Sequence, residues 1–286
     1  MWAVIHNQTQ FSNAHASIVV NDDAGVVVVA FKGTELDSAR VKESVIDWIF
    51  SNFDATLTPC ELSQQCTDTN VHSGYQRNVL SIHRQVIDQI ERYINAGYLL
   101  MLTGHSKGGA MSTLATVSIH SAFARRVSDL DRRIYNLNFG SPMTGDSSFV
   151  SYYDSSVPDD RTMRFINRYS GAVDYRDDFI TTVPGSLLKF AHTKNERIVP
   201  CHRRYFGNPD PIPNINFRFS DTFMLPIVIG CHFQQCYMDG LLYEDVVDTR
   251  DDEQRRTLGT LLQDNELPSI RIVIQSFLQR LMTINS

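Results

Sequence analysis

The fold of this chain is decided by one stretch, Leu99-Leu100-Met101-Leu102-Thr103-Gly104-His105-Ser106-Lys107-Gly108-Gly109-Ala110. An apolar run leads into a Gly-x-Ser-x-Gly pentapeptide, and small and apolar residues at helical spacing follow it. This order predicts a strand, a sharp turn with Ser106 at its apex, and a helix that begins near Lys107. Gly104 and Gly108 are required because side chains two positions before and two after the serine would collide.

The predicted turn gives Ser106 the position of a hydroxyl nucleophile. It lifts Oγ above the sheet and directs the Lys107 backbone N–H to the place where an oxyanion would form. The pentapeptide alone arises by chance in about one chain of this length in twenty. The alternative is therefore an ordinary strand-to-helix turn, but the apolar flanks favour the catalytic one.

The surrounding pattern predicts an α/β fold. Residues 18–20 and 26–31 form a predicted hairpin, whose second strand is apolar on both faces and therefore central. An amphipathic helix is predicted over 76–95, and further strands over 134–139 and 163–167. Strands that alternate with helices predict a mostly parallel central sheet flanked by helices.

The last third of the chain gives weaker patterns. We expect an irregular loop over 200–219, a helix over 234–247 and a terminal helix over about 268–282. No repeat or linker is apparent. The whole chain, residues 1–286, is therefore expected to form one domain, with 248–286 as a helical extension packed on it.

Composition excludes several classes of protein. The 286 residues carry a net charge of −6 without a basic stripe, so nucleic acid is not an expected partner. No apolar run reaches the roughly 20 residues of a transmembrane span. Residues 1–7 contain no basic segment followed by a long apolar run, so we expect no standard export signal in this chain. The location is then cytoplasmic by default, or secreted if the chain is a trimmed mature form.

The chain has five cysteines. Cys60 and Cys66 bracket a polar loop and are placed to close a short disulfide. Cys201-His202 and Cys231-His232 with Cys236 allow a zinc cluster, but no Cys-x-x-Cys spacing occurs. Buried thiols or one or two disulfides are the favoured interpretation, and no metal site is predicted.

A serine nucleophile needs a base, and the base needs an acid that orients it. In folds of this kind the acid and then the base follow the serine along the chain. Three acids lie on the loop after the strand 163–167: Asp174, Asp177 and Asp178. The later histidines are His192, His202 and His232, and His232 directly follows the apolar run 225–229.

Five segments, in order, resemble blocks of one known family. They are Phe31-Lys32-Gly33-Thr34, Asp47-Trp48-Ile49, Val71-His72-Ser73-Gly74-Tyr75, Gly104-His105-Ser106-Lys107-Gly108-Gly109-Ala110, and Phe139-Gly140-Ser141-Pro142 with Gly145 and Phe149. The family is the class 3 lipases, which includes the fungal triacylglycerol lipases. The resemblance covers roughly residues 15–240 and implies an α/β-hydrolase fold.

The resemblance also implies roles. Ser106 is the nucleophile, and the oxyanion hole uses the backbone N–H groups of Thr34 and Lys107. Asp178 best matches the acid, with Asp177 as the close alternative. His232 matches the base in a His-x-x-x-x-Tyr block that ends at Tyr237, and His192 matches a structural histidine. The lid and substrate-binding segment contains Trp48, Ile49 and Phe50, although these apolar residues fit a core-facing helix equally well.

The activity implied is hydrolysis of carboxylic esters of lipids through an acyl-enzyme, with no metal or organic cofactor. The expected partner is a lipid or ester substrate, at a lipid–water interface if the lid operates; the oligomeric state is not predicted. Alternatives are a short-chain carboxylesterase, a peptidase, or a non-catalytic binding protein on a hydrolase scaffold. Lys107 and Lys32 replace the family's leucine and arginine, and the segment 35–45 is longer and more charged than is typical.

Overall fold

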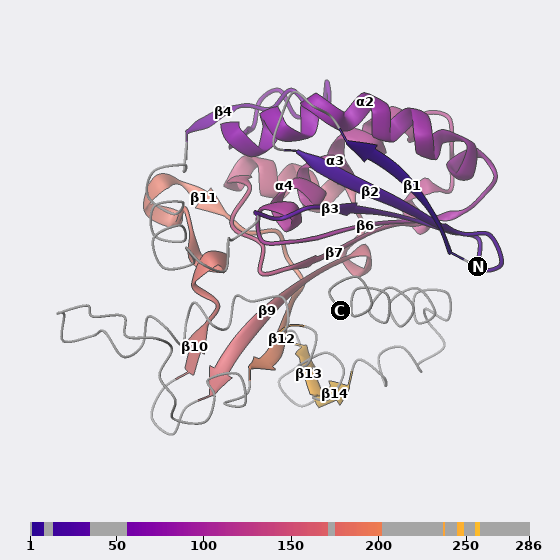
Figure 1. Cartoon of the computed structure of the whole chain (residues 1–286). Helices are drawn as coiled ribbons and strands as arrows, with labels where there is room; N and C mark the ends of the chain where they lie inside the picture. Colours follow the sequence, from indigo (N-terminus) through magenta and orange to yellow (C-terminus); the bar gives the residue numbers. More distant parts are fainter. Residues whose placement is uncertain are drawn as a thin grey trace.

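A large, twisted β-sheet forms the centre of the molecule (Figure 1). The computed structural model describes residues 2–8, 14–34, 56–170, 175–201, 237, 245–248 and 255–257. Among these, the strands of the large sheet are ordered β1 (Trp2–Gln8), β2 (His15–Asn21), β3 (Val26–Phe31), β6 (Leu99–His105), β7 (Ile134–Phe139), β9 (Thr162–Ser170), β12 (Glu196–Cys201), β13 (Asp245–Asp248) and β14 (Arg255–Thr257). β10 (Tyr175–Asp177) pairs with β9.

The middle of this sheet is parallel. β3, β6, β7, β9 and β12 run in the same direction. At the two sides the pairing is antiparallel: β2 pairs in this way with β1 and β3, and β13 pairs in this way with β12 and β14. The predicted α/β architecture and the predicted hairpin of β2 and β3 are therefore confirmed. Because parallel strands end at the same edge, the turns that follow β3, β6, β7 and β9 are neighbours.

Three helices cover one face of the sheet: α2 (Ser73–Asn95), α3 (Lys107–Phe123) and α4 (Ser147–Ser156) (Figure 1). The strand order β3-β6-β7-β9 advances in one direction, and right-handed crossovers then place the connecting helices on the same side. α2 buries the predicted stripe, Val79, Ile82, Val86, Ile90, Tyr93 and Ile94. α3 is buried on almost all sides, because it lies between the sheet and α2.

A small second sheet lies beside these helices, with the order β11 (Phe190–Ala191), β8 (Gly145–Asp146), β5 (Asn70–His72) and β4 (Leu57–Pro59). Four short 3-10 helices complete the described elements: η1 (Leu130–Arg132), η2 (Asp159–Arg161), η3 (Phe179–Thr182) and η4 (Ser186–Leu188). None of the helices in the described ranges combines the length and apolarity that a bilayer crossing requires.

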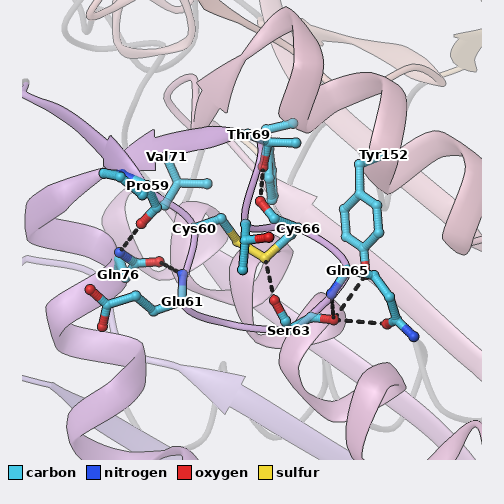
Figure 2. Close-up of a disulfide and its surroundings, with 12 residues drawn as sticks. Pro59, Cys60, Glu61, Ser63, Gln65, Cys66, Thr69, Val71, Gln76 and Tyr152 are labelled. Atoms are coloured by element: carbon cyan, nitrogen blue, oxygen red, sulfur yellow. Dashed lines mark hydrogen bonds between the residues drawn. A yellow bond between two sulfur atoms is a disulfide. The ribbon is translucent and has the colours of Figure 1, made fainter.

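Cys60 and Cys66 form a disulfide in the loop between β4 and β5, the short bridge that their spacing in the sequence allows (Figure 2). Both cysteines are buried. The Gln76 side chain of α2 accepts from the Glu61 N–H (2.8 Å) and donates to the Pro59 carbonyl (3.0 Å). Tyr152 of α4 donates to the Ser63 hydroxyl (3.2 Å). The disulfide loop is thereby fastened to two helices.

Three predictions for the last third need correction. The helix expected over 234–247 is wrong at its end, because Asp245–Asp248 is strand β13. The helical extension expected over 248–286 contains strand β14, and residues 258–286 lie outside the described ones. The loop expected from residue 200 begins too early, because β12 continues to Cys201. β12 and β13 form here because each pairs with a strand far away in the sequence, and β14 then pairs with β13; local patterns do not reveal the distant pairs.

Candidate active site

Ser106 occupies the strained turn that the sequence predicts. It follows β6 directly, has φ 57° and ψ −128°, and precedes the first residue of α3. A positive φ in a residue other than glycine costs on the order of 1–3 kcal/mol and persists only where the surroundings enforce it. Here the Ser106 N–H donates to the Phe139 carbonyl of β7 (2.9 Å), which fixes the turn against the sheet.

The two glycines of the pentapeptide are sterically required. A Cβ on Gly104 would lie 2.3 Å from the carbonyl carbon and oxygen of Gly108. A Cβ on Gly108 would lie 2.1 Å from the carbonyl oxygen of Phe31, at the end of β3. Backbone atoms cannot yield by such amounts, so the turn closes only with glycine at both positions.

The chain after β3 lies directly beside the serine. A Cβ on Gly33 would be 2.8 Å from the His105 carbonyl oxygen and 3.7 Å from the Ser106 Cβ. The next residue, Thr34, has a buried Oγ1 with no hydrogen-bond partner within the described part of the chain. On the other side, Lys107 starts α3, so its backbone N–H lies at the positive N-terminal end of that helix. Potential donors thus flank Ser106 on both sides.

Asp178 is a fully buried carboxylate beyond the end of β10. Its Oδ1 accepts from the Ile180 N–H (2.9 Å) and its Oδ2 accepts from the Tyr237 hydroxyl (2.7 Å). Its own N–H donates to the Asn167 carbonyl of β9 (2.8 Å). Hydrogen bonds to both oxygens fix the orientation of the carboxylate.

Tyr237 connects this acid to the serine turn. Its hydroxyl also accepts from the Asn167 N–H (3.1 Å). Its ring lies edge-on to His105, the residue before Ser106, with a centroid distance of 5.7 Å, and edge-on to Phe139 at 6.2 Å. Sequence reasoning assigned Tyr237 no role. The signal was its place in the His-x-x-x-x-Tyr block, but the hydrogen bond to Asp178 depends on residues far apart in the chain.

A sequence model of the lipases (class 3) matches residues 28–187, more than half of the chain. The chain belongs to the class 3 lipase family. Among curated relatives, the chloroplastic phospholipase A(1) DAD1 of Arabidopsis thaliana is 27% identical over 60% of this chain and 36% of its own length. A lipase of Rhizomucor miehei is 23% identical over 66% of this chain and 46% of its own length. The chain thus spans less than half the length of these two relatives.

Solved lipase structures show the same fold. The native Rhizomucor miehei lipase propeptide complex superposes with a TM-score of 0.53 at 22% identity, over 69% of this chain and 57% of that one. Lipase II from Rhizopus niveus gives 0.53 at 16% identity, over 70% of this chain and 66% of that one. The architecture of this class 3 lipase family member is therefore the α/β-hydrolase fold, with Ser106 at the carboxyl edge of its sheet.

Two lysines lie near the Ser106 turn. Lys107 is half-buried, and its burial, together with the positive charge of Lys32, lowers the pKa of its ammonium group. Lys32 is exposed and lies two residues before Thr34. The surroundings of Ser106 are therefore electropositive, through two side chains and the α3 N-terminus together.

His192 packs against η3, the short helix that Asp178 begins. Its Nε2 contacts the Thr181 carbonyl oxygen. Burial and the nearby Arg164 lower the pKa of His192 to about 3, so the ring is neutral at pH 7 and Nε2–H is the donor. This geometry supports the structural role that the family resemblance implies for His192.

Several predicted site residues lie outside the described ones: His232, His202, Asp174 and the lid residues Trp48, Ile49 and Phe50. Asp177 belongs to β10. The zinc cluster considered above also falls mostly outside this part, because only the backbone of Cys201 is described. Within the described ranges, no group of three or more potential ligands that could hold a metal ion occurs.

Proposed function

We propose that this protein hydrolyses carboxylic esters of lipids, with Ser106 as nucleophile, His232 as base and Asp178 as the orienting acid. The observation that carries the proposal is the strained Ser106 turn with donors on both sides, in a chain of the class 3 lipase family. The relatives' names support lipid esters as the substrate class, since they include a phospholipase A(1), a lipase and a secreted mono- and diacylglycerol lipase.

In the proposed reaction, His232 takes the proton of Ser106 Oγ while this oxygen attacks the ester carbonyl. Asp178 holds the imidazole and stabilises its cation. His232 precedes Tyr237 by five positions, and a chain of this length spans at most about 18 Å. Because Tyr237 is hydrogen-bonded to Asp178, this limit supports a location of His232 within reach of the acid.

The oxyanion is stabilised from both sides of Ser106. The backbone N–H groups of Thr34 and Lys107 are the proposed donors, and the Thr34 hydroxyl is a third. Its buried oxygen has no partner among the described residues, which supports this use. Loss of one oxyanion donor typically costs about 3 kcal/mol of transition-state stabilisation. The His232 imidazolium then protonates the departing alkoxide, and water hydrolyses the acyl-enzyme.

Ser106 is only 5% exposed, which favours a movement that widens the access of a substrate to it. The segment with Trp48, Ile49 and Phe50 remains our proposal for the lid that moves. An enzyme that opens at a lipid surface would hydrolyse aggregated esters faster than dissolved ones. A short-chain carboxylesterase would show the opposite preference.

Labelling with a fluorophosphonate probe tests the nucleophile. We expect the wild type to be labelled at Ser106, and Ser106→Ala to lose both labelling and hydrolysis of p-nitrophenyl esters. Ser118→Ala is the matched control, because Ser118 is a buried serine of the same helix region, α3. It should keep both activities. Labelling that persists in Ser106→Ala would refute the assignment, and an unlabelled wild type would favour the binding-protein alternative.

A further inference from the structure

The 3-10 turn η4 carries two leucines on the surface. Leu187 is 97% exposed and Leu188 is 53% exposed, and these are the exposed large hydrophobic residues in the part of the chain whose side chains are described. One exposed leucine is ordinary on a protein surface. Two consecutive ones on one projecting turn, with no further exposed large hydrophobic residue among the described side chains, indicate an interaction site.

The turn is held in a fixed shape. The Leu188 N–H donates to the Gly185 carbonyl (3.1 Å), and the Lys189 N–H donates to the Ser186 carbonyl (2.9 Å). Gly185 and Lys189 at its two ends both have positive φ, 94° and 65°. The following Phe190 is buried and starts β11, which pairs with β8. The leucines therefore stand on a rigid projection, and such a projection loses little conformational freedom on binding.

The turn belongs to the edge of the sheet that carries the proposed catalytic residues. It follows Asp178 by way of η3. The Met143 N–H donates to the Val183 carbonyl (2.9 Å), which joins this segment to the chain that leaves β7. In Figure 1, β11 lies beyond the left-hand ends of β3, β6 and β7. The leucines thus project from the side where Ser106 and Asp178 lie.

The charge of the turn fits a lipid surface with phosphate groups. Lys189 is exposed directly after the leucines, and residues 183–191 contain no acidic side chain. The protein as a whole has a net charge of −6, whereas this turn carries a positive charge. Leucines next to a lysine match the layering of a bilayer surface, in which acyl chains lie below anionic headgroups.

We propose that Ser186–Lys189 is an interfacial anchor: Leu187 and Leu188 enter the surface of a lipid aggregate while Lys189 pairs with headgroup phosphates. The anchor rests on the proposed lipid-ester activity and defines how that activity meets its substrate. It holds the sheet edge with Ser106 against the lipid. Dissolved esters reach the serine without it.

The test uses vesicles and an inactive background. In Ser106→Ala protein, which cannot consume the lipid, binding to phosphatidylcholine vesicles with about one-third phosphatidylglycerol is measured by sedimentation. We expect Leu187→Ser/Leu188→Ser to bind at least about tenfold more weakly, and the matched Leu187→Met/Leu188→Met variant to bind like its parent. Lys189→Gln should weaken binding several-fold only on the anionic vesicles, and about 0.5 M salt should abolish that difference.

Activity supplies a second readout that separates this proposal from the proposed function. With Ser106 intact, the double serine variant should lose hydrolysis of emulsified esters and keep dissolved p-nitrophenyl butyrate turnover within about twofold. Unchanged vesicle binding would overturn the anchor while ester hydrolysis stands. Equal loss on dissolved ester would place the leucines in the active site instead. Self-association that disappears in the serine variant, with vesicle binding unchanged, would identify a second copy of the chain as the partner.

Discussion

The hydroxyl group of Tyr237 links the proposed acid, Asp178, to strand β9. It donates to Asp178 Oδ2 and accepts from the Asn167 N–H, and the side chain is 1% exposed. Without this oxygen, a buried N–H and a carboxylate oxygen would each lose a partner. The proposed acid would then lose one of the hydrogen bonds that orient its carboxylate.

Tyr237→Phe tests this positioning role. It keeps the ring against His105 and removes only the hydroxyl, so we expect kcat for a dissolved ester to fall roughly tenfold with KM almost unchanged. The free energy of unfolding should fall by about 1–3 kcal/mol. Tyr153→Phe is the matched control, because its buried hydroxyl bonds Asn136 and Thr162 away from the serine. It should lose stability and keep kcat. An equal loss of kcat in both variants would contradict the positioning role.

At the scale of single elements, the sequence predicted those whose determinants are local. The β6–α3 turn depends on sterics within five residues, because a side chain at position 104 would clash with the backbone of Gly108. The stripe of α2 repeats within one helix. β12 has no such local signal: Arg197 is buried within it, and Glu196 pairs with Arg164 of β9 at 2.7 Å. Its stability comes from partners about thirty residues away, and the bond between Tyr237 and Asp178 escaped prediction for the same reason.

The loop between β4 and β5 gives a prediction at this scale. Cys60 and Cys66 have a sequence separation of 6, and a disulfide that closes so short a loop stabilises by about 2 kcal/mol in the chain-entropy account. Cys60→Ala/Cys66→Ala should therefore lower the free energy of unfolding by about this amount in urea titrations. Dithiothreitol should lower the wild type similarly and leave the double variant unaffected. If dithiothreitol leaves the free energy of unfolding of the wild type unchanged, the hydrogen bonds of Gln76 and Ser63 are sufficient to hold the loop.

At the scale of the whole molecule, one edge of the sheet gathers groups from distant parts of the chain. β3 supplies the segment with Thr34, β6 leads to Ser106, and β9 with β10 leads to Asp178 and the leucine turn η4. The parallel order makes this possible, since each strand delivers its following loop to the same side. Residues that pack against these loops then affect both the stability of the fold and the shape of the site. His192, which contacts the Thr181 carbonyl oxygen of η3, is one of them.

His192 links the stability of the whole fold to pH. Its pKa is about 3 in the folded protein and 6.5 as its ordinary value, because burial and Arg164 oppose the charged ring. Between these values the unfolded chain binds a proton that the folded chain excludes. The free energy of unfolding therefore keeps its full value above pH 6.5 and falls as the pH is lowered toward 3, by at most about 1.4 kcal/mol per pH unit from this residue.

His192→Gln removes this titration and keeps an amide that can donate to the Thr181 carbonyl. Chemical denaturation of both proteins at about pH 7.5, 5.5 and 4.5 measures the effect, because titrations common to both cancel in the difference. We expect a constant difference near pH 7 and a change of about 1 kcal/mol per unit in favour of the variant below pH 6. If the free energies of unfolding of the two proteins change with pH in the same way over the whole range, His192 binds its proton equally well in the folded and the unfolded protein. The ring would then not be held in the neutral form that donates to the Thr181 carbonyl.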